Sequence, residues 1–163
     1  MLLVKNMKKI FSIVLLVILT ASINSCGYQL RGVQEVNFKS ISINGGSKSF
    51  TKILMKKFRQ SNVKIKNIEA EKSLEIVNDK FSKEILSLSS KGKVKEYQIM
   101  YTVSYRVKSK DGLWSSPVKV ETSRDFTFDD ANIIAKTEEE SRLIKGMQEQ
   151  LIRTIVTQIS VSK

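Results

Sequence analysis

The chain contains one cysteine and no histidine among its 163 residues, and this restricts the chemistry that it can perform. Without histidine, it cannot build a Ser-His or Cys-His pair for covalent catalysis or use the common histidine ligands of zinc. The acidic residues fall on predicted strand surfaces or at the start of the last predicted helix, which does not suggest an acid–base pair. We therefore expect a binding protein with no enzyme activity, no metal site and no cofactor.

A targeting segment occupies the start of the chain. Three lysines between residues 5 and 9 precede an apolar run from residue 10 to residue 19. This run is too short to cross a bilayer, which needs about 20 residues, but it has the length of the apolar part of a secretory signal, about 7–15 residues. Translation from either Met1 or Met7 leaves a positively charged region before the run. We therefore expect the chain to be exported.

Cys26 follows this segment and indicates a lipid anchor. The residues Ile-Asn-Ser-Cys at 23–26 resemble the bacterial lipoprotein box, whose cysteine is acylated and becomes the mature N-terminus. Gly27 rather than an aspartate follows the cysteine, which favours the outer membrane over the inner membrane. We predict a signal peptide over residues 1–25 and a lipid on Cys26 that anchors the protein at the periplasmic face of the outer membrane. The alternative is an ordinary signal peptide cut near Ala21.

Size and charge limit the rest of the chain. Residues 26–163 are enough for one compact domain and too few for two. Lys and Arg number 28 against 16 Asp and Glu in the whole chain, a net charge of +12, which favours an anionic ligand. We expect no nucleic acid, because an exported protein rarely meets any and no nucleic-acid-binding motif is visible. The alternative source of the charge is a lysine-rich genome composition.

The periodicity of the apolar residues predicts a mixed fold. In chain order it predicts a strand over 36–43, a helix capped by Ser49, a strand over 73–89 with a bulge or a break, a strand over 97–107, a strand over 118–128 and a helix over 137–161. Thr137 and Glu140 have the spacing of a capping box for the last helix. The pattern predicts an α+β two-layer sandwich in the order β-α-β-β-β-α, with a mostly antiparallel four-stranded sheet and two helices on one face.

Several short motifs then point to one family. Cys-Gly-Tyr-Gln-Leu-Arg-Gly at residues 26–32 looks like the mature N-terminus of the LptE family of lipopolysaccharide-assembly lipoproteins. Lys-Glu-Tyr-Gln at 95–98, Phe-Thr-Phe-Asp at 126–129 and Ile-Ala-Lys at 134–136 follow in the order and spacing of that family. The resemblance implies a protein that sits partly inside the lumen of the LptD β-barrel as a plug. Such a protein helps lipopolysaccharide to reach the outer leaflet.

Three lysines are the candidate contacts for lipopolysaccharide phosphates. Lys91 and Lys93 flank Gly92 in the turn before the 97–107 strand, and Lys136 precedes the last predicted helix. In the two-layer fold both segments should lie toward the same end of the sheet, where lysine is a workable phosphate ligand. The alternatives are three solvated surface charges, and a structural periplasmic lipoprotein scaffold that binds no lipopolysaccharide. An envelope hydrolase is the least favoured reading.

Overall fold

The computed structural model describes residues 36–110 and 112–161. The predicted signal peptide over residues 1–25 and the predicted lipidation site Cys26 lie outside these residues. Within them the chain forms five strands, two α-helices and one short 3₁₀ helix. In chain order these are β1 (Ser40–Gly45), α2 (Lys48–Gln60), β2 (Lys64–Ile65), β3 (Lys72–Leu88), β4 (Val94–Ser109), β5 (Val118–Thr127), η2 (Asp130–Asn132) and α3 (Ile133–Val161).

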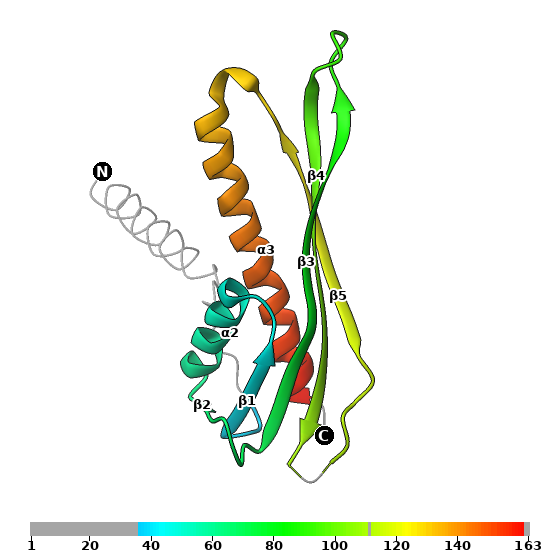
Figure 1. Ribbon diagram of the computed structural model, residues 1–163. Coiled ribbons are helices and arrows are strands. Elements are labelled where there is room, and N and C mark those ends of the chain that lie inside the picture. The colour runs from blue at the N-terminus through cyan, green and yellow to red at the C-terminus, as the bar shows by residue number, and fades with distance from the viewer. Residues whose placement is uncertain (1–35, 111, 162–163) are drawn as a thin grey trace, which may run out of the picture. The chain divides into compact units, whose positions relative to one another are not determined.

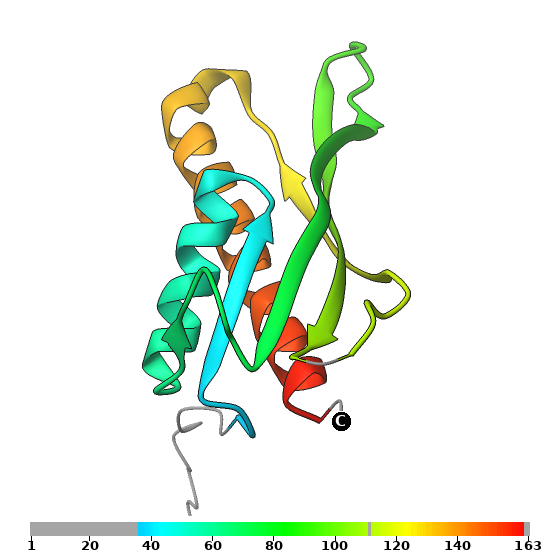
Figure 2. The ribbon, with the colours of Figure 1, turned by 60° about the horizontal axis from the view of Figure 1, so that its bottom comes forward.

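The strands of the described residues form one sheet in the order β2-β1-β3-β4-β5. β3, β4 and β5 make an antiparallel meander, whereas β1 pairs in parallel with both β2 and β3. Figures 1 and 2 show α2 and α3 on the same side of this sheet. The predicted α+β sandwich is therefore confirmed. The predicted strand number is wrong by one, because the two-residue β2 adds a fifth strand too short to leave an alternating pattern in the sequence.

Alternation in β4 and helical spacing in α2 build the core between the two layers. Every second residue of β4 from Ile99 to Tyr105 is buried, and these side chains face the helices. α2 contributes Phe50, Leu54 and Phe58, which recur at four-residue spacing and are fully buried. The last helix contributes a buried stripe in its second half: Met147, Leu151, Ile152, Ile155, Val156 and Ile159.

The irregularity predicted in the strand over 73–89 is a bulge rather than a break. The register of β3 against β4 shifts between Ile76 and Asn78 and again after Ile85. Leu74 and Ile76 are buried before the first shift, whereas Phe81 and Ile85 lie opposite Tyr101 and Tyr97 after it. The extra residue at the first shift returns Phe81 and Ile85 to the helix-facing side, and this explains the change of parity there.

Two predicted helix starts are wrong by a few residues. Ser47, not Ser49, caps α2, because its side chain accepts the Phe50 amide while its own hydroxyl donates to Asp79 Oδ2 at 2.6 Å. α3 begins at Ile133, so the predicted capping box at Thr137 does not exist. The Thr137 hydroxyl instead donates to the Ile133 carbonyl one turn earlier, as a threonine inside a helix commonly does.

Candidate binding site at the start of the last helix

The chain between β5 and α3 is fixed by one carboxylate. Asp129 caps η2, since its side chain accepts the Ala131 amide at 3.0 Å and the Asn132 side-chain amide at 3.0 Å. The Ala131 amide, followed by Asn132, holds the pKa of the Asp129 carboxyl below its ordinary value, and Lys136 and Lys93 lower it further. A charged carboxylate with two lysines nearby therefore marks the point where the sheet leads into the last helix.

The structure brings two of the three predicted lysines to this point. Lys93 reaches from the turn before β4 to Asp130, with 3.1 Å between Nζ and Oδ2. Lys136 lies in the first turn of α3 and pairs with Glu139 at 2.9 Å. Both ammonium groups therefore already contact carboxylates, and an incoming phosphate would have to compete with Asp130 and Glu139 for them.

The third lysine is placed differently. Lys91 is exposed in the turn that joins β3 to β4, where the Gly92 amide donates to the Ser89 carbonyl at 2.9 Å. Lys91 forms no ion pair with any other described residue. Lys91 is therefore the most accessible of the three lysines to a flexible ligand, because its ammonium does not have to break an ion pair before it binds a phosphate.

A fourth lysine at this end of the fold was not singled out from the sequence. Lys83 Nζ lies 2.6 Å from Glu140 Oε2 and 4.2 Å from the centre of the Tyr97 ring. The rings of Phe126 and Phe128 are at 5.5 and 5.8 Å from the same ammonium. Three aromatic rings and one carboxylate thus surround it, which is how proteins hold a cation internally. Lys83 lies two residues from both Phe81 and Ile85 on β3, so the alternation of the strand puts the three side chains on one face. This pattern is the sequence feature that could have identified Lys83.

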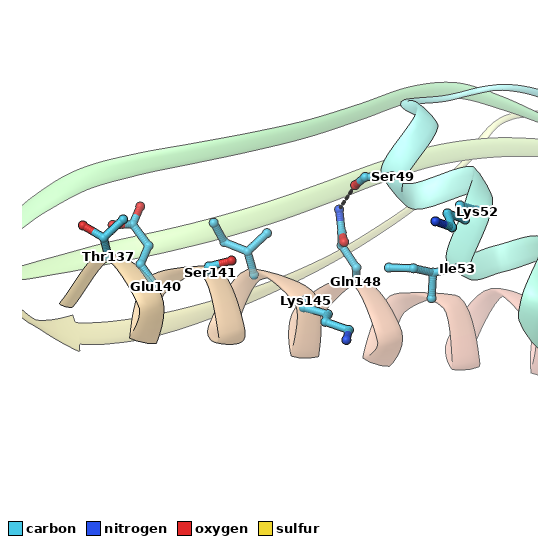
Figure 3. A pocket seen from close by; sticks show the side chains of 9 residues that line it. Ser49, Lys52, Ile53, Thr137, Glu140, Ser141, Lys145 and Gln148 are labelled. Carbon is cyan, nitrogen blue, oxygen red and sulfur yellow. Dashed lines mark hydrogen bonds between the residues drawn. The ribbon is translucent and has the colours of Figure 1, made fainter. Parts of the chain in front are cut away.

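Next to this cluster, a groove of about 540 Å³ lies between the first turns of α2 and the first half of α3. Figure 3 shows Ser49 of α2 above Gln148 of α3, with a hydrogen bond of 3.2 Å between them. Gln148 is only 6% exposed and also donates to the Tyr101 hydroxyl at 3.0 Å. Burial raises the pKa of Tyr101, and the Gln148 hydrogen bond partly opposes that shift. Gln148 therefore gives the groove one buried, hydrogen-bonded polar group, while Lys52 and Lys145 contribute to its lining.

Within residues 36–110 and 112–161, no three His, Cys, Asp or Glu side chains gather closely enough to hold a metal ion. None of the helices in this part of the chain combines the length and apolar character needed to cross a membrane.

Comparison with known proteins gives the family. The family model described as LptE, Lipopolysaccharide-assembly, matches residues 38–159. The chain belongs to the LptE family. It therefore has a role in lipopolysaccharide assembly, and its relatives are lipoproteins. No curated protein matches the chain.

Solved structures agree with this membership. The LptE-family chain is 27% identical to the rare lipoprotein B from Shewanella oneidensis, with a TM-score of 0.67, covering 74% of this chain and 93% of that one. It is 30% identical to the uncharacterized lipoprotein B from Nitrosomonas europaea, with a TM-score of 0.69, covering 82% and 90%. A minor lipoprotein from Acinetobacter baumannii, at 20% identity and a TM-score of 0.62 over 77% and 92%, shows the same fold.

Proposed function

We propose that this LptE-family protein is a lipoprotein of the outer membrane, anchored through Cys26, that docks in the lumen of the LptD β-barrel. In this role it assists the passage of lipopolysaccharide to the outer leaflet. The family match supports a role in lipopolysaccharide assembly, and the polar face of the sheet supports docking in the barrel lumen. Lipopolysaccharide binding through Lys91, Lys93 and Lys136 is a separate part of the proposal.

The observation that carries the docking proposal is the polar face of the sheet that points away from α2 and α3. No helix of the described residues lies on this face, and its side chains on β4 and β5 are mostly polar. On β5 these are Lys119, Glu121, Ser123 and Asp125, all exposed, and Lys119 and Glu121 form an ion pair at 2.7 Å. The interior of a wide outer-membrane barrel is polar and hydrated. A plug should present such a surface to it.

Co-purification tests the docking proposal. The full-length lipoprotein, extracted from membranes in mild detergent, should bring a large β-barrel with it. Replacing Ser123 by Trp on the polar face should reduce the amount of barrel recovered, whereas Lys56→Trp on the exposed side of α2 should not. A lipoprotein recovered without any barrel would favour the alternative, a periplasmic scaffold.

Charge reversal tests the lipopolysaccharide proposal independently. The three lysines lie at one end of the fold, where Lys93 and Lys136 both flank Asp129 and lower the pKa of its carboxyl. The triple replacement of Lys91, Lys93 and Lys136 by Glu should weaken lipopolysaccharide binding at least about tenfold, since each phosphate contact with a cation is charge-assisted. The same triple replacement at exposed lysines elsewhere, Lys56, Lys64 and Lys66, is the matched control. Equal affinities for the two triple variants would remove the assignment and leave the docking proposal intact.

A further inference from the structure

β3 is much longer than its parallel neighbour β1, so part of the β3 backbone has no partner strand among the described residues on that side. β1 pairs with β3 only as far as Gly45 opposite Ile76, and the chain then turns away into α2. On the other side, β4 accompanies β3 to Leu88. Figure 2 shows β3 continuing beyond β1 with no strand of the described residues on that side. Between the two bulges, Asn78–Ile85 is therefore a regular open edge of eight residues, about 26 Å long.

This edge exposes apolar side chains. Phe81 and Ile85 point to the helix-facing side of the sheet, where their partners on β4 are Tyr101 and Tyr97. Tyr101 is buried, yet Phe81 is 37% exposed and Ile85 is 59% exposed. Soluble proteins usually shorten, charge or cover such an edge, since it can pair with another chain. A long edge with two exposed apolar residues indicates that something covers it.

The groove described above lies beside this edge. Glu140 lines the groove and also pairs with Lys83 of β3, so the strand and the groove are in contact. The half-buried Ile144 contributes an apolar surface to the groove. In Figure 3, the side chains of Glu140 and Gln148 project from α3 toward the strands. A strand added to β3 would direct alternate side chains into the space between β3 and α3.

The charges around the edge favour an acidic occupant. Lys52 and Lys145 lie in the groove and Lys80 lies on the open edge, and none of the three forms an ion pair with another described residue. On the edge itself the exposed Glu84, which also forms no ion pair with a described residue, offsets Lys80, whereas in the groove Glu140 is paired with Lys83. Side chains that an added strand directs into the groove would therefore meet the unpaired Lys52 and Lys145.

We propose that the open edge of β3, Asn78–Ile85, accepts an extended segment of a partner protein as an added β-strand. Backbone hydrogen bonds to β3 hold the segment, and the side chains on its helix-facing side are apolar residues that contact Phe81 and Ile85 and carboxylates that pair with Lys52 and Lys145. A second copy of this chain is a poorer occupant, because the face of its edge that carries Phe81 and Ile85 also carries Lys83, which would meet the lysines of the groove. The inference requires neither docking in a barrel nor lipopolysaccharide binding.

Hydrogen exchange with a defined peptide tests this proposal. The protein is the full chain in dodecyl maltoside micelles, and the probe is the acetylated and amidated octapeptide Thr-Val-Thr-Glu-Thr-Val-Thr-Glu, whose valines and glutamates share one face. In the free protein, alternate amides of Asn78–Ile85 should exchange fast, because in an antiparallel pair every second amide points away from the partner strand. Peptide binding should slow those amides by at least about tenfold, because they become hydrogen-bonded.

Matched peptides and variants separate strand addition from other binding. The same peptide methylated on four consecutive backbone nitrogens should not bind, since it cannot donate to β3. Phe81→Lys combined with Ile85→Lys should weaken peptide binding by about tenfold or more, because charged edges resist pairing and the apolar contact is lost. The control carries Leu113→Lys and Ile134→Lys, which alter two residues at 94% and 77% exposure away from the edge.

Three results would overturn the proposal. The first is a full set of protected amides over Asn78–Ile85 in the free protein, which would mean that the edge is already closed. The second is failure of the peptide to bind, or equal binding of the methylated peptide. The third is self-association of the full chain through β3, seen by analytical ultracentrifugation and abolished by the Phe81 and Ile85 replacements. That result would identify a second copy as the occupant.

Discussion

Lys83 of β3 and Glu140 of α3 form an ion pair of 2.6 Å between two elements that are far apart in the sequence. Their side chains are 27% and 19% exposed, so the pair is shielded from water more than a typical surface pair. The Tyr97 ring adds a cation–π contact at 4.2 Å from Nζ. This pair ties the long strand to the first half of the last helix.

Replacing Lys83 should therefore destabilise the fold. Lys83→Met should lower the free energy of unfolding by about 1–3 kcal/mol, because Glu140 loses its partner and the aromatic rings lose their cation. Glu140→Gln should cost less, since a side-chain amide can still accept from the Lys83 ammonium. Urea denaturation of the purified lipoprotein in detergent measures both values.

A lysine on the same strand provides the control for that prediction. Lys80 is exposed and forms no ion pair with a described residue, so Lys80→Met should change the stability by about 0.5 kcal/mol or less. If Lys83→Met and Lys80→Met had the same effect, the pair with Glu140 would contribute nothing measurable.

Gly45 should tolerate no side chain, because it ends β1 against the backbone of β3. Its φ is +74°, and a Cβ atom there would lie 2.3 Å from the Ile76 carbonyl oxygen. Gly45→Ala should therefore lower the free energy of unfolding by about 2–5 kcal/mol, through backbone strain and a clash. Gly92 has nearly the same φ, +73°, but an added Cβ meets nothing within 4 Å. Gly92→Ala should cost only the strain, about 1–2 kcal/mol. Equal losses for the two variants would show that the predicted clash relaxes.

The elements that depend on a long regular pattern could be predicted from the sequence. The alternation in β4 and the four-residue spacing of Phe50, Leu54 and Phe58 in α2 both appear as buried faces. The helix starts could not be fixed this way, because Ser47 and Ser49 are both good caps and the choice depends on distant partners. Asp79 engages Ser47, whereas Gln148 engages Ser49. β2 was missed because two residues carry no period.

The site was predicted only in part, for a related reason. The convergence of Lys93 and Lys136 follows from strand direction and loop length, which the sequence shows. The carboxylates that already bind them, Asp130 and Glu139, depend on side-chain positions around the 3₁₀ turn, which the sequence does not show. The role of Lys83 depends on the first bulge of β3, which decides that this side chain faces α3.

Two buried tyrosines should make the fold sensitive to alkali. Burial raises the pKa of both Tyr101 and Tyr105 above the value of an unfolded tyrosine, about 10. Above the unfolded pKa, the folded state retains phenol protons that the unfolded state loses. The titration of these groups therefore leaves the stability unchanged below about pH 10, and the stability falls as the pH rises through their folded pKa. The variant with Tyr101→Phe and Tyr105→Phe should lose less stability between pH 9 and pH 11 than the native chain. Urea denaturation at each pH compares the two slopes, and identical slopes would contradict the assignment.

Removing the carboxylate that competes for Lys93 should strengthen lipopolysaccharide binding, if Lys93 is a ligand as proposed. The Lys93–Asp130 pair is exposed, with side-chain exposures of 70% and 55%, and such pairs contribute about 0–1 kcal/mol. Asp130→Asn should therefore increase the affinity for lipopolysaccharide by a factor of about 2–5, because the Lys93 ammonium no longer has to leave the Asp130 carboxylate to bind a phosphate. Glu121→Gln, which breaks the exposed pair with Lys119 on β5, removes the same charge elsewhere and should leave the affinity nearly unchanged.

Isothermal titration with lipopolysaccharide at two salt concentrations measures the difference, which should shrink at high salt. An equal gain for both variants would indicate a general effect of net charge, and no gain for Asp130→Asn would exclude Lys93 from the phosphate site.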